Sequence, residues 1–143
     1  MSPVQLDAAG FRALLDRLAA AWAARDAPAA ASCFTSDASY MEPPSEQLFR
    51  GREELLAYFE PLEQGTFLAL RGTWFDEASQ TGVLEFSFGV SGRDAADHGV
   101  AVIEVRDGLI ASWREYVRQG PATFEEFASA EDKQWRWHAG NYP

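Results

Sequence analysis

The chain has 143 residues, with 12 Lys and Arg against 22 Asp and Glu, and a formal net charge of −10. Apolar residues make up 47% and charged residues 24%, a composition typical of one globular domain and not of a disordered chain. Because its net charge is strongly negative, the chain repels phosphate backbones and anionic lipids. We therefore expect neither a nucleic-acid nor a membrane partner. The single cysteine, Cys33, cannot form an internal disulfide and is expected to be a small buried apolar residue.

The N-terminal third predicts helices. One stripe of apolar residues recurs at spacings of three and four: Phe11, Leu14, Leu15, Leu18 and Trp22. Ser2 followed by Pro3 is the expected start of this first helix. Asp26 is expected to cap a short second helix that ends near Phe34, and a third helix is expected from about Arg52 to Leu62.

No apolar run reaches the roughly 18 residues that a membrane span needs. The N-terminal segment also lacks the basic start and apolar core of a signal peptide. The expected location is therefore the reducing cytoplasm.

From Thr66 onward the hydrophobic period changes from about 3.6 residues to two. Four segments alternate, at residues 67–75, 83–90, 99–106 and 109–118. Their short connectors favour antiparallel hairpins, because a parallel crossover needs about a dozen residues or more. A shorter strand, Ala38–Glu42, is expected between the second and third helices. Helices first and an antiparallel meander afterwards predict an α+β fold with the helices packed on one face of a curved sheet.

The last of these segments has an acid on its apolar face. Glu115 alternates with Trp113 and Val117, whereas Arg114 and Tyr116 lie on the other side. A buried carboxyl is costly unless it is hydrogen-bonded, paired or protonated. Glu115 is therefore either a structural acid held by a nearby polar group or a functional one.

The neighbouring segments surround that acid with apolar residues. Phe86 and Phe88 share one inward face, as do Ala101 and Ile103, and the small Gly99 and Ala101 would leave room for a cavity. Residues opposite them are expected to face solvent or a second subunit: Glu85, Ser87, Glu104 and Arg106.

Tyr40 and Glu42 share one face of the shorter strand. If that face is the inner one, a phenol and a second carboxyl join Glu115. On spacing alone, the alternative that Glu42 points to water near a sheet edge is favoured. His98 and His138 have no ligand spacing, so no metal is expected, and neither a phosphate-binding loop nor a nucleophile elbow is present.

Several local segments resemble the nuclear transport factor 2-like superfamily. They are FTSDASY at residues 34–40 and FRGREELL at 49–56; GVAVIEVRDG at 99–108 and IASWREY at 110–116 resemble its SnoaL-like and limonene-epoxide-hydrolase-like branches. The resemblance implies one domain, with a core at about residues 6–128 and an aromatic tail at 129–143. It implies a cone-shaped, strongly curved antiparallel sheet wrapped round N-terminal helices, which encloses an apolar pocket and often forms a homodimer.

Matched to the epoxide-hydrolase pattern, Tyr40 takes the position of a catalytic Tyr, Glu42 that of an Asn, and Glu115 that of the final Asp. Phe86 and Phe88 fall where that pattern has an Arg and an Asp. This departure counts against the usual epoxide-opening relay and makes the chain more similar to the SnoaL-type cyclases and steroid-isomerase relatives.

Two functional hypotheses follow. The first is a cofactor-free acid–base enzyme, an isomerase, cyclase or epoxide-opening hydrolase that acts on a hydrophobic, oxygen-bearing small molecule. Its expected catalytic residues are Glu115, Tyr40 and Glu42, and its expected substrate-binding residues are Trp113, Phe86, Phe88, Trp74, Ile103 and Ala101. The second is a non-catalytic module that binds a hydrophobic ligand or only dimerises.

The C-terminal region is rich in aromatic residues. The stretch from Phe124 to Phe127 is expected to form a short helix that plugs one end of the cone. Trp135 and Trp137 are expected either to close the pocket mouth or to pack on a second subunit. A homodimer is expected, with the outer faces of the two sheets in contact.

Overall fold

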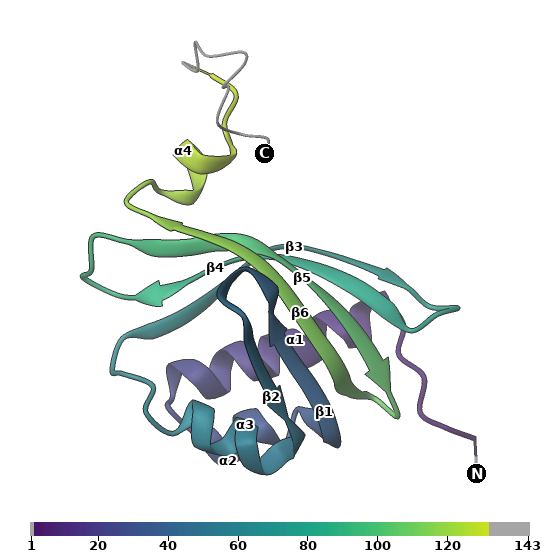
Figure 1. Cartoon of the computed structure of the whole chain (residues 1–143). Helices are drawn as coiled ribbons and strands as arrows, with labels where there is room; N and C mark the ends of the chain where they lie inside the picture. The colour runs from purple at the N-terminus through teal and green to yellow at the C-terminus, as the bar shows by residue number, and fades with distance from the viewer. Residues whose placement is uncertain (1, 132–143) are drawn as a thin grey trace.

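The computed structural model describes residues 2–131, and the expectations for Trp135 and Trp137 lie outside this part of the chain. Four α-helices, one 3-10 helix and six strands follow one another in this range (Figure 1). In chain order they are α1 (Ala8–Ala23), α2 (Ala27–Ala31), β1 (Phe34–Glu42), η1 (Pro43–Ser45), β2 (Gln47–Arg50), α3 (Gly51–Phe59), β3 (Thr66–Asp76), β4 (Thr81–Val90), β5 (Ala96–Arg106), β6 (Leu109–Gly120) and α4 (Phe124–Ala128).

The strands form one sheet in the order β2-β1-β6-β5-β4-β3. Strands β3 to β6 form the antiparallel meander that the sequence predicts, and the α+β fold class is confirmed. β1 begins at Phe34, four residues earlier than expected, and lies parallel to β6, with Tyr40 opposite Trp113. The short strand β2 was not expected, because three of its four residues are exposed and give no alternation.

The helix starts follow their capping residues. Asp7, and not Ser2, caps α1: its carboxylate accepts from the Gly10 N–H at 2.7 Å. Asp26 caps α2 as expected, accepting from the Ala29 N–H at 3.0 Å. α2 ends at Ala31 and not near Phe34, because the chain there enters β1.

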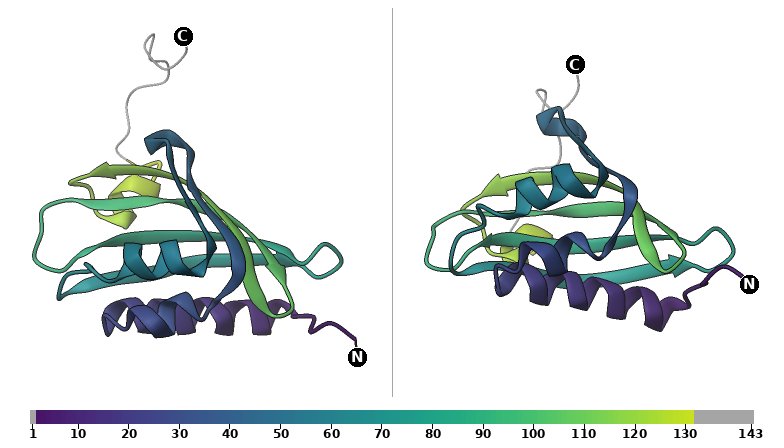
Figure 2. Two further views of the ribbon diagram at one scale, coloured as in Figure 1. Left: turned by 60° about the horizontal axis from the view of Figure 1, so that its bottom comes forward. Right: turned by 90° about the horizontal axis from the view of Figure 1, so that it is seen from below.

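The helices α1, α2 and α3 lie on the concave side of the curved sheet (Figure 2). The buried apolar residues of these helices and of the strands form one core cluster. The apolar stripe of α1 is buried as predicted, and Cys33 is buried as well. Gly99 does not create cavity space. A Cβ there would meet the backbone of Tyr116 and Val117, so the missing side chain lets β5 and β6 lie close together.

α4 lies on the convex side of the sheet and does not plug the end of the cone (Figure 1). His98 Nε2 lies 2.7 Å from the Ala122 carbonyl oxygen, and its ring is 5.2 Å from the ring of Phe127. His98 Nδ1 lies 2.8 Å from the hydroxyl of Ser87. Ser87, expected to face solvent or a partner, is therefore buried, because His98 and α4 lie over it. No helix of the described residues is long and apolar enough to cross a membrane.

Candidate active site

A cavity of about 360 Å³ lies between the helices and the concave face of the sheet. Its size falls in the range of small-molecule sites. Side chains from all layers line it: Trp22, Tyr40, Glu42, Ser45, Gln47, Tyr58, Phe59, Leu62, Phe86, Phe88, Asp97, Glu115, Val117 and Gln119.

Glu115 forms part of the wall of this cavity and is only 6% exposed. The parallel pairing of β1 with β6 sets Tyr40 opposite Trp113, two residues before Glu115. In this register the Tyr40 hydroxyl donates a hydrogen bond of 2.9 Å to Glu115 Oε1. The ring of Tyr40 stacks on that of Trp113, with centroids 5.4 Å apart, and this packing fixes the phenol.

Glu42, at the end of β1, faces the same cavity. It accepts hydrogen bonds of 2.8 Å from the Tyr58 hydroxyl and 2.8 Å from Gln47 Nε2. It is also hydrogen-bonded to Glu115. The water-facing orientation that spacing alone favours for Glu42 is not observed, because β2 and α3 place Gln47 and Tyr58 beside it.

The electrostatics of the cavity keep a proton on Glu115. Burial, the hydrogen bond to Glu42 and the negative charge of Glu42 raise the pKa of Glu115 to about 8, although the Tyr40 hydrogen bond acts in the opposite direction. Burial and the nearby carboxylates raise the pKa of the Tyr40 and Tyr58 hydroxyls well above 10, so both phenols stay protonated donors. Burial also raises the pKa of Asp97, against the hydrogen bond from Gln119.

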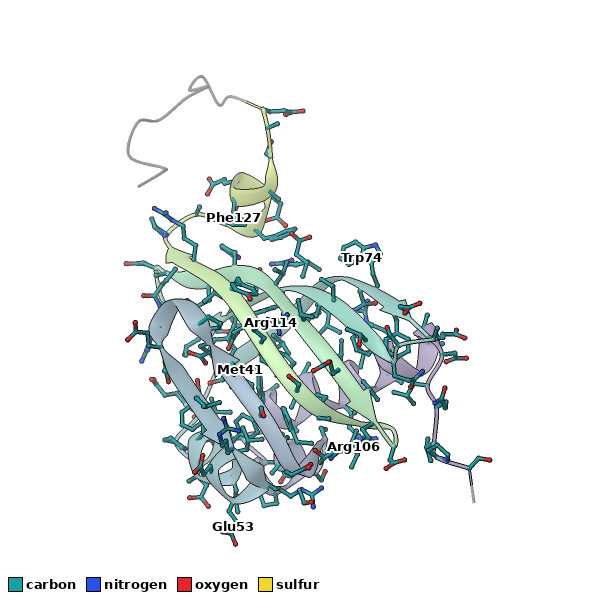
Figure 3. All side chains as sticks on the ribbon, turned by 45° about the vertical axis from the view of Figure 1, so that its right-hand side comes forward. Met41, Glu53, Trp74, Arg106, Arg114 and Phe127 are labelled. Carbon is teal, nitrogen blue, oxygen red and sulfur yellow. The ribbon has the colours of Figure 1, made fainter. Side chains whose placement is uncertain are left out.

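Of the residues expected to bind substrate, Phe86 and Phe88 line the cavity. Trp113, Ile103 and Ala101 are completely buried in the core and do not line it. Trp74 lies outside it: its side chain is 60% exposed and projects from the edge of the sheet (Figure 3).

A β-bulge explains the position of Trp74. Leu70 pairs with Phe86 but Gly72 pairs with Glu85, so one extra residue interrupts the alternation of β3. Every later side chain therefore changes face. Phe75 turns inward and stacks on Phe11 with ring centroids 4.6 Å apart, and Trp74 turns outward.

Residues 15–113 match the family model described as the SnoaL-like domain. The chain belongs to the SnoaL-like domain family. No curated protein sequence matches this SnoaL-like protein.

Solved structures share the fold of the SnoaL-like chain at low sequence identity. A protein of unknown function with a cystatin-like fold from Methylobium petroleophilum is 16% identical, with 98% of this chain and 99% of that one covered and a TM-score of 0.72. A provisionally assigned ketosteroid isomerase from Kribbella flavida is 18% identical, with 90% and 93% covered and a TM-score of 0.69. An epoxide hydrolase of M. tuberculosis, similar to limonene-epoxide hydrolase, is 15% identical, with 78% and 84% covered and a TM-score of 0.64. These likenesses confirm the nuclear transport factor 2-like fold.

The SnoaL-like cavity also contains polar residues that the sequence analysis missed. Asp97 and Gln119 lie on the inward faces of β5 and β6, just beyond the predicted ends of these strands. Extending the alternation would have found both, because Asp97 lies two residues before Gly99 and Gln119 lies four residues after Glu115. Tyr58 had no such signal, because its partner Glu42 comes from another element.

Among residues 2–131, no group of three or more His, Cys, Asp or Glu side chains has the arrangement of a metal site. Among the same residues, the acid–base groups of the SnoaL-like cavity are three carboxyls, those of Glu42, Asp97 and Glu115, and the phenols of Tyr40 and Tyr58.

Proposed function

We propose that this protein is an acid–base enzyme that moves protons on a hydrophobic, oxygen-bearing small molecule, and that isomerisation is its reaction type. The observation that supports this most is the pairing of Glu42 with Glu115 in the wall of an aromatic cavity. Each of the two carboxyls also accepts a hydrogen bond from a tyrosine hydroxyl. Two interacting carboxyls share a proton, so one is available as a base while the other is available as an acid.

In this proposal Glu42 is the base and the protonated Glu115 is the acid. When substrate binds, the hydrogen bond between the two carboxyls is exchanged for contacts with the substrate. Glu42 then removes a proton from a carbon next to the carbonyl group, while Glu115 gives its proton to the carbonyl oxygen, which forms an enol. Glu115 then takes the hydroxyl proton back, and Glu42 returns its proton to another carbon of the conjugated system. Both carboxyls end in their starting state, and no cofactor is consumed.

Tyr40 and Tyr58 act as positioning residues. Each hydroxyl already donates a hydrogen bond to a carboxyl oxygen, Tyr40 to Glu115 and Tyr58 to Glu42. A phenol with one proton cannot donate to substrate at the same time. Their function in the proposal is to hold the two carboxyl groups at fixed positions and to tune their acidity.

Trp22 supports the oxygen-bearing class of substrate. This wall residue is 4% exposed, and its indole N–H has no hydrogen-bond partner among the described residues. Buried donors in native proteins normally have a partner. A carbonyl or ether oxygen of a ligand bound within reach of this N–H would give it an acceptor, and the phenylalanines of the wall provide an apolar surface for the rest of the molecule.

The test is a panel of enones, cyclisable polyketide-like ketones and epoxides, followed by kinetics on the best substrate. Replacing Glu115→Gln or Glu42→Gln is expected to lower kcat about 10²- to 10⁴-fold, which is the usual contribution of a general acid or base. Glu104→Gln makes the same Glu-to-Gln substitution at an exposed position on β5 and should leave kcat unchanged. Unchanged turnover in both cavity variants would overturn the proposal.

A non-catalytic ligand-binding module is the second candidate. It is favoured by Phe86 and Phe88, which line the cavity where the epoxide-hydrolase pattern has an Arg and an Asp. Native mass spectrometry and extraction of the purified protein test it: a stoichiometric hydrophobic ligand released chemically unchanged, together with no turnover on the panel, supports this candidate.

A further inference from the structure

The charges around the cavity have one sign. Three carboxyl groups line it, those of Glu42, Asp97 and Glu115, and none of its described lining residues is Lys, Arg or His. Burial is the largest cause of the raised pKa values of Glu115 and Asp97, and the negative charge of Glu42 raises both further, so the carboxyls repel one another. A ligand with a carboxylate or phosphate group would add to this repulsion, whereas a positive charge would relieve it.

The rest of the wall is aromatic. Six rings line the cavity, those of Trp22, Tyr40, Tyr58, Phe59, Phe86 and Phe88. They also pack on one another: the Trp22 ring lies 5.5 Å from that of Phe59 and 5.6 Å from that of Phe88. The face of an aromatic ring attracts a cation, most strongly where water is excluded, and aromatic cages recognise quaternary ammonium groups in this way.

Asp97 is the carboxyl that the proposed proton transfer does not use. It is part-buried on β5, pairs across the sheet with Phe88, and receives a hydrogen bond from the Gln119 side chain. No Lys or Arg within residues 2–131 forms an ion pair with it, since the salt bridges of this part of the chain involve Asp16, Asp37 and Glu63. Asp97 thus has no ion-pair partner in the described part of the chain and is available as a counter-ion next to Phe88, its cross-strand neighbour.

We infer that the cavity selects a hydrophobic organic cation, an amine or quaternary ammonium compound, and that Asp97 is the residue that pairs with its positive charge. The inference rests on the proposed function only in that both use the same cavity: the ammonium group lies beside Asp97 and Phe88, and the oxygen-bearing part of the molecule lies over Glu42 and Glu115. It narrows the substrate class from hydrophobic ketones in general to amino ketones and related compounds.

Three small probes of almost the same shape test this inference on the wild-type protein. Choline is the cation, 3,3-dimethylbutan-1-ol is its neutral isostere, and 3,3-dimethylbutanoate is an anion of similar size. Binding is followed by NMR at pH 7 and 150 mM salt through the indole N–H signal of Trp22, a wall residue. We expect choline to bind at least ten-fold more tightly than the alcohol, and the anion to bind more weakly than both. Equal or tighter binding of the alcohol would overturn the inference.

Two variants test whether Asp97 is the residue that pairs with the positive charge of the ligand. Asp97→Asn should reduce the preference for choline over the alcohol to less than about three-fold, while the alcohol still binds and shows that the cavity is intact. Glu104→Gln, which makes the same change in net charge at an exposed site, should keep the full preference. A full preference in Asp97→Asn would overturn the role of Asp97.

The two proposals fail independently, because these probes measure binding and not turnover. A cavity that prefers the neutral alcohol while Glu115→Gln abolishes turnover would leave the enzyme proposal standing and remove the cation inference. A strong preference for choline together with undiminished turnover in Glu115→Gln and Glu42→Gln would leave the cation inference standing and remove the enzyme proposal.

Discussion

The Glu115 carboxyl links the stability of the protein to pH. Its pKa rises from 4.5 to about 8 on folding. A group whose pKa is raised in the folded state stabilises the fold below pH 4.5, and this stabilisation is lost as the pH rises through 8. The free energy of unfolding of the wild type should therefore fall between these limits relative to that of Glu115→Gln, by on the order of a few kcal/mol.

Urea unfolding of both proteins at pH 5.5 and pH 8.5 measures this difference. Asp97 also has a raised pKa, but it is present in both proteins, so the comparison isolates Glu115. The same pH dependence in the wild type and in Glu115→Gln would show that Glu115 is ionised throughout.

The Tyr40 hydroxyl lowers the pKa of Glu115 through its hydrogen bond. Tyr40→Phe should therefore raise the pKa of Glu115 further, and should cost about 1–2 kcal/mol of stability because a buried acceptor loses its donor. Carboxyl ¹³C NMR titration and urea unfolding measure the two effects. Tyr116→Phe is the matched control. Tyr116 lies next to Glu115 on β6, but its side chain is on the other face of the sheet and is 43% exposed. A Glu115 pKa that stays constant in Tyr40→Phe would mean that the phenol only packs.

At the scale of elements, the contact between β5 and β6 depends on a missing side chain. A Cβ at Gly99 would collide with the Tyr116 carbonyl and with the backbone of Val117, which cannot move without breaking the ladder. Gly99→Ala should therefore destabilise the protein by about 2–4 kcal/mol, measured by urea unfolding. Gly120→Ala is the control, because a Cβ there meets nothing within 4 Å. Equal stabilities of the two variants would contradict this account.

At the scale of the whole molecule, we propose that two copies associate through the convex faces of their sheets. The exposed Trp74 and Tyr116 are available on this side, but a net charge of −10 makes two copies repel at long range. Added salt should therefore favour the dimer by screening this repulsion, while apolar burial provides the attraction.

Sedimentation equilibrium is expected to give twice the 15.8-kDa mass of the chain at micromolar concentration. Tyr116→Glu, which adds a like charge to both convex faces, should shift the equilibrium to monomers, whereas Tyr58→Phe inside the cavity should not. A mass of 15.8 kDa at every accessible concentration would contradict the proposal.

The sequence by itself determines the features that depend on local periodicity. Four features were predictable: the apolar stripe on α1, the cap at Asp26, the four long strands and the inward orientation of Glu115. Apart from the cap, which follows from residue type, they can be read from the repeats of 3.6 residues in helices and two in strands, because these repeats show which side chains face the core. The same rule would have found Asp97 and Gln119 had the strand ends been extended.

Only the tertiary structure decides what these elements meet. The extra residue at the β3 bulge turns Trp74 outward, and α4 covers the part of the convex face around His98, because His98 and the Ala122 carbonyl come together there. The pairing of Glu42 with Glu115 depends on the parallel register of β1 and β6, two strands separated by residues 43–108, nearly half of the chain. No local pattern encodes such a contact, because its position follows from sheet order and register, which only the packing of the whole chain fixes.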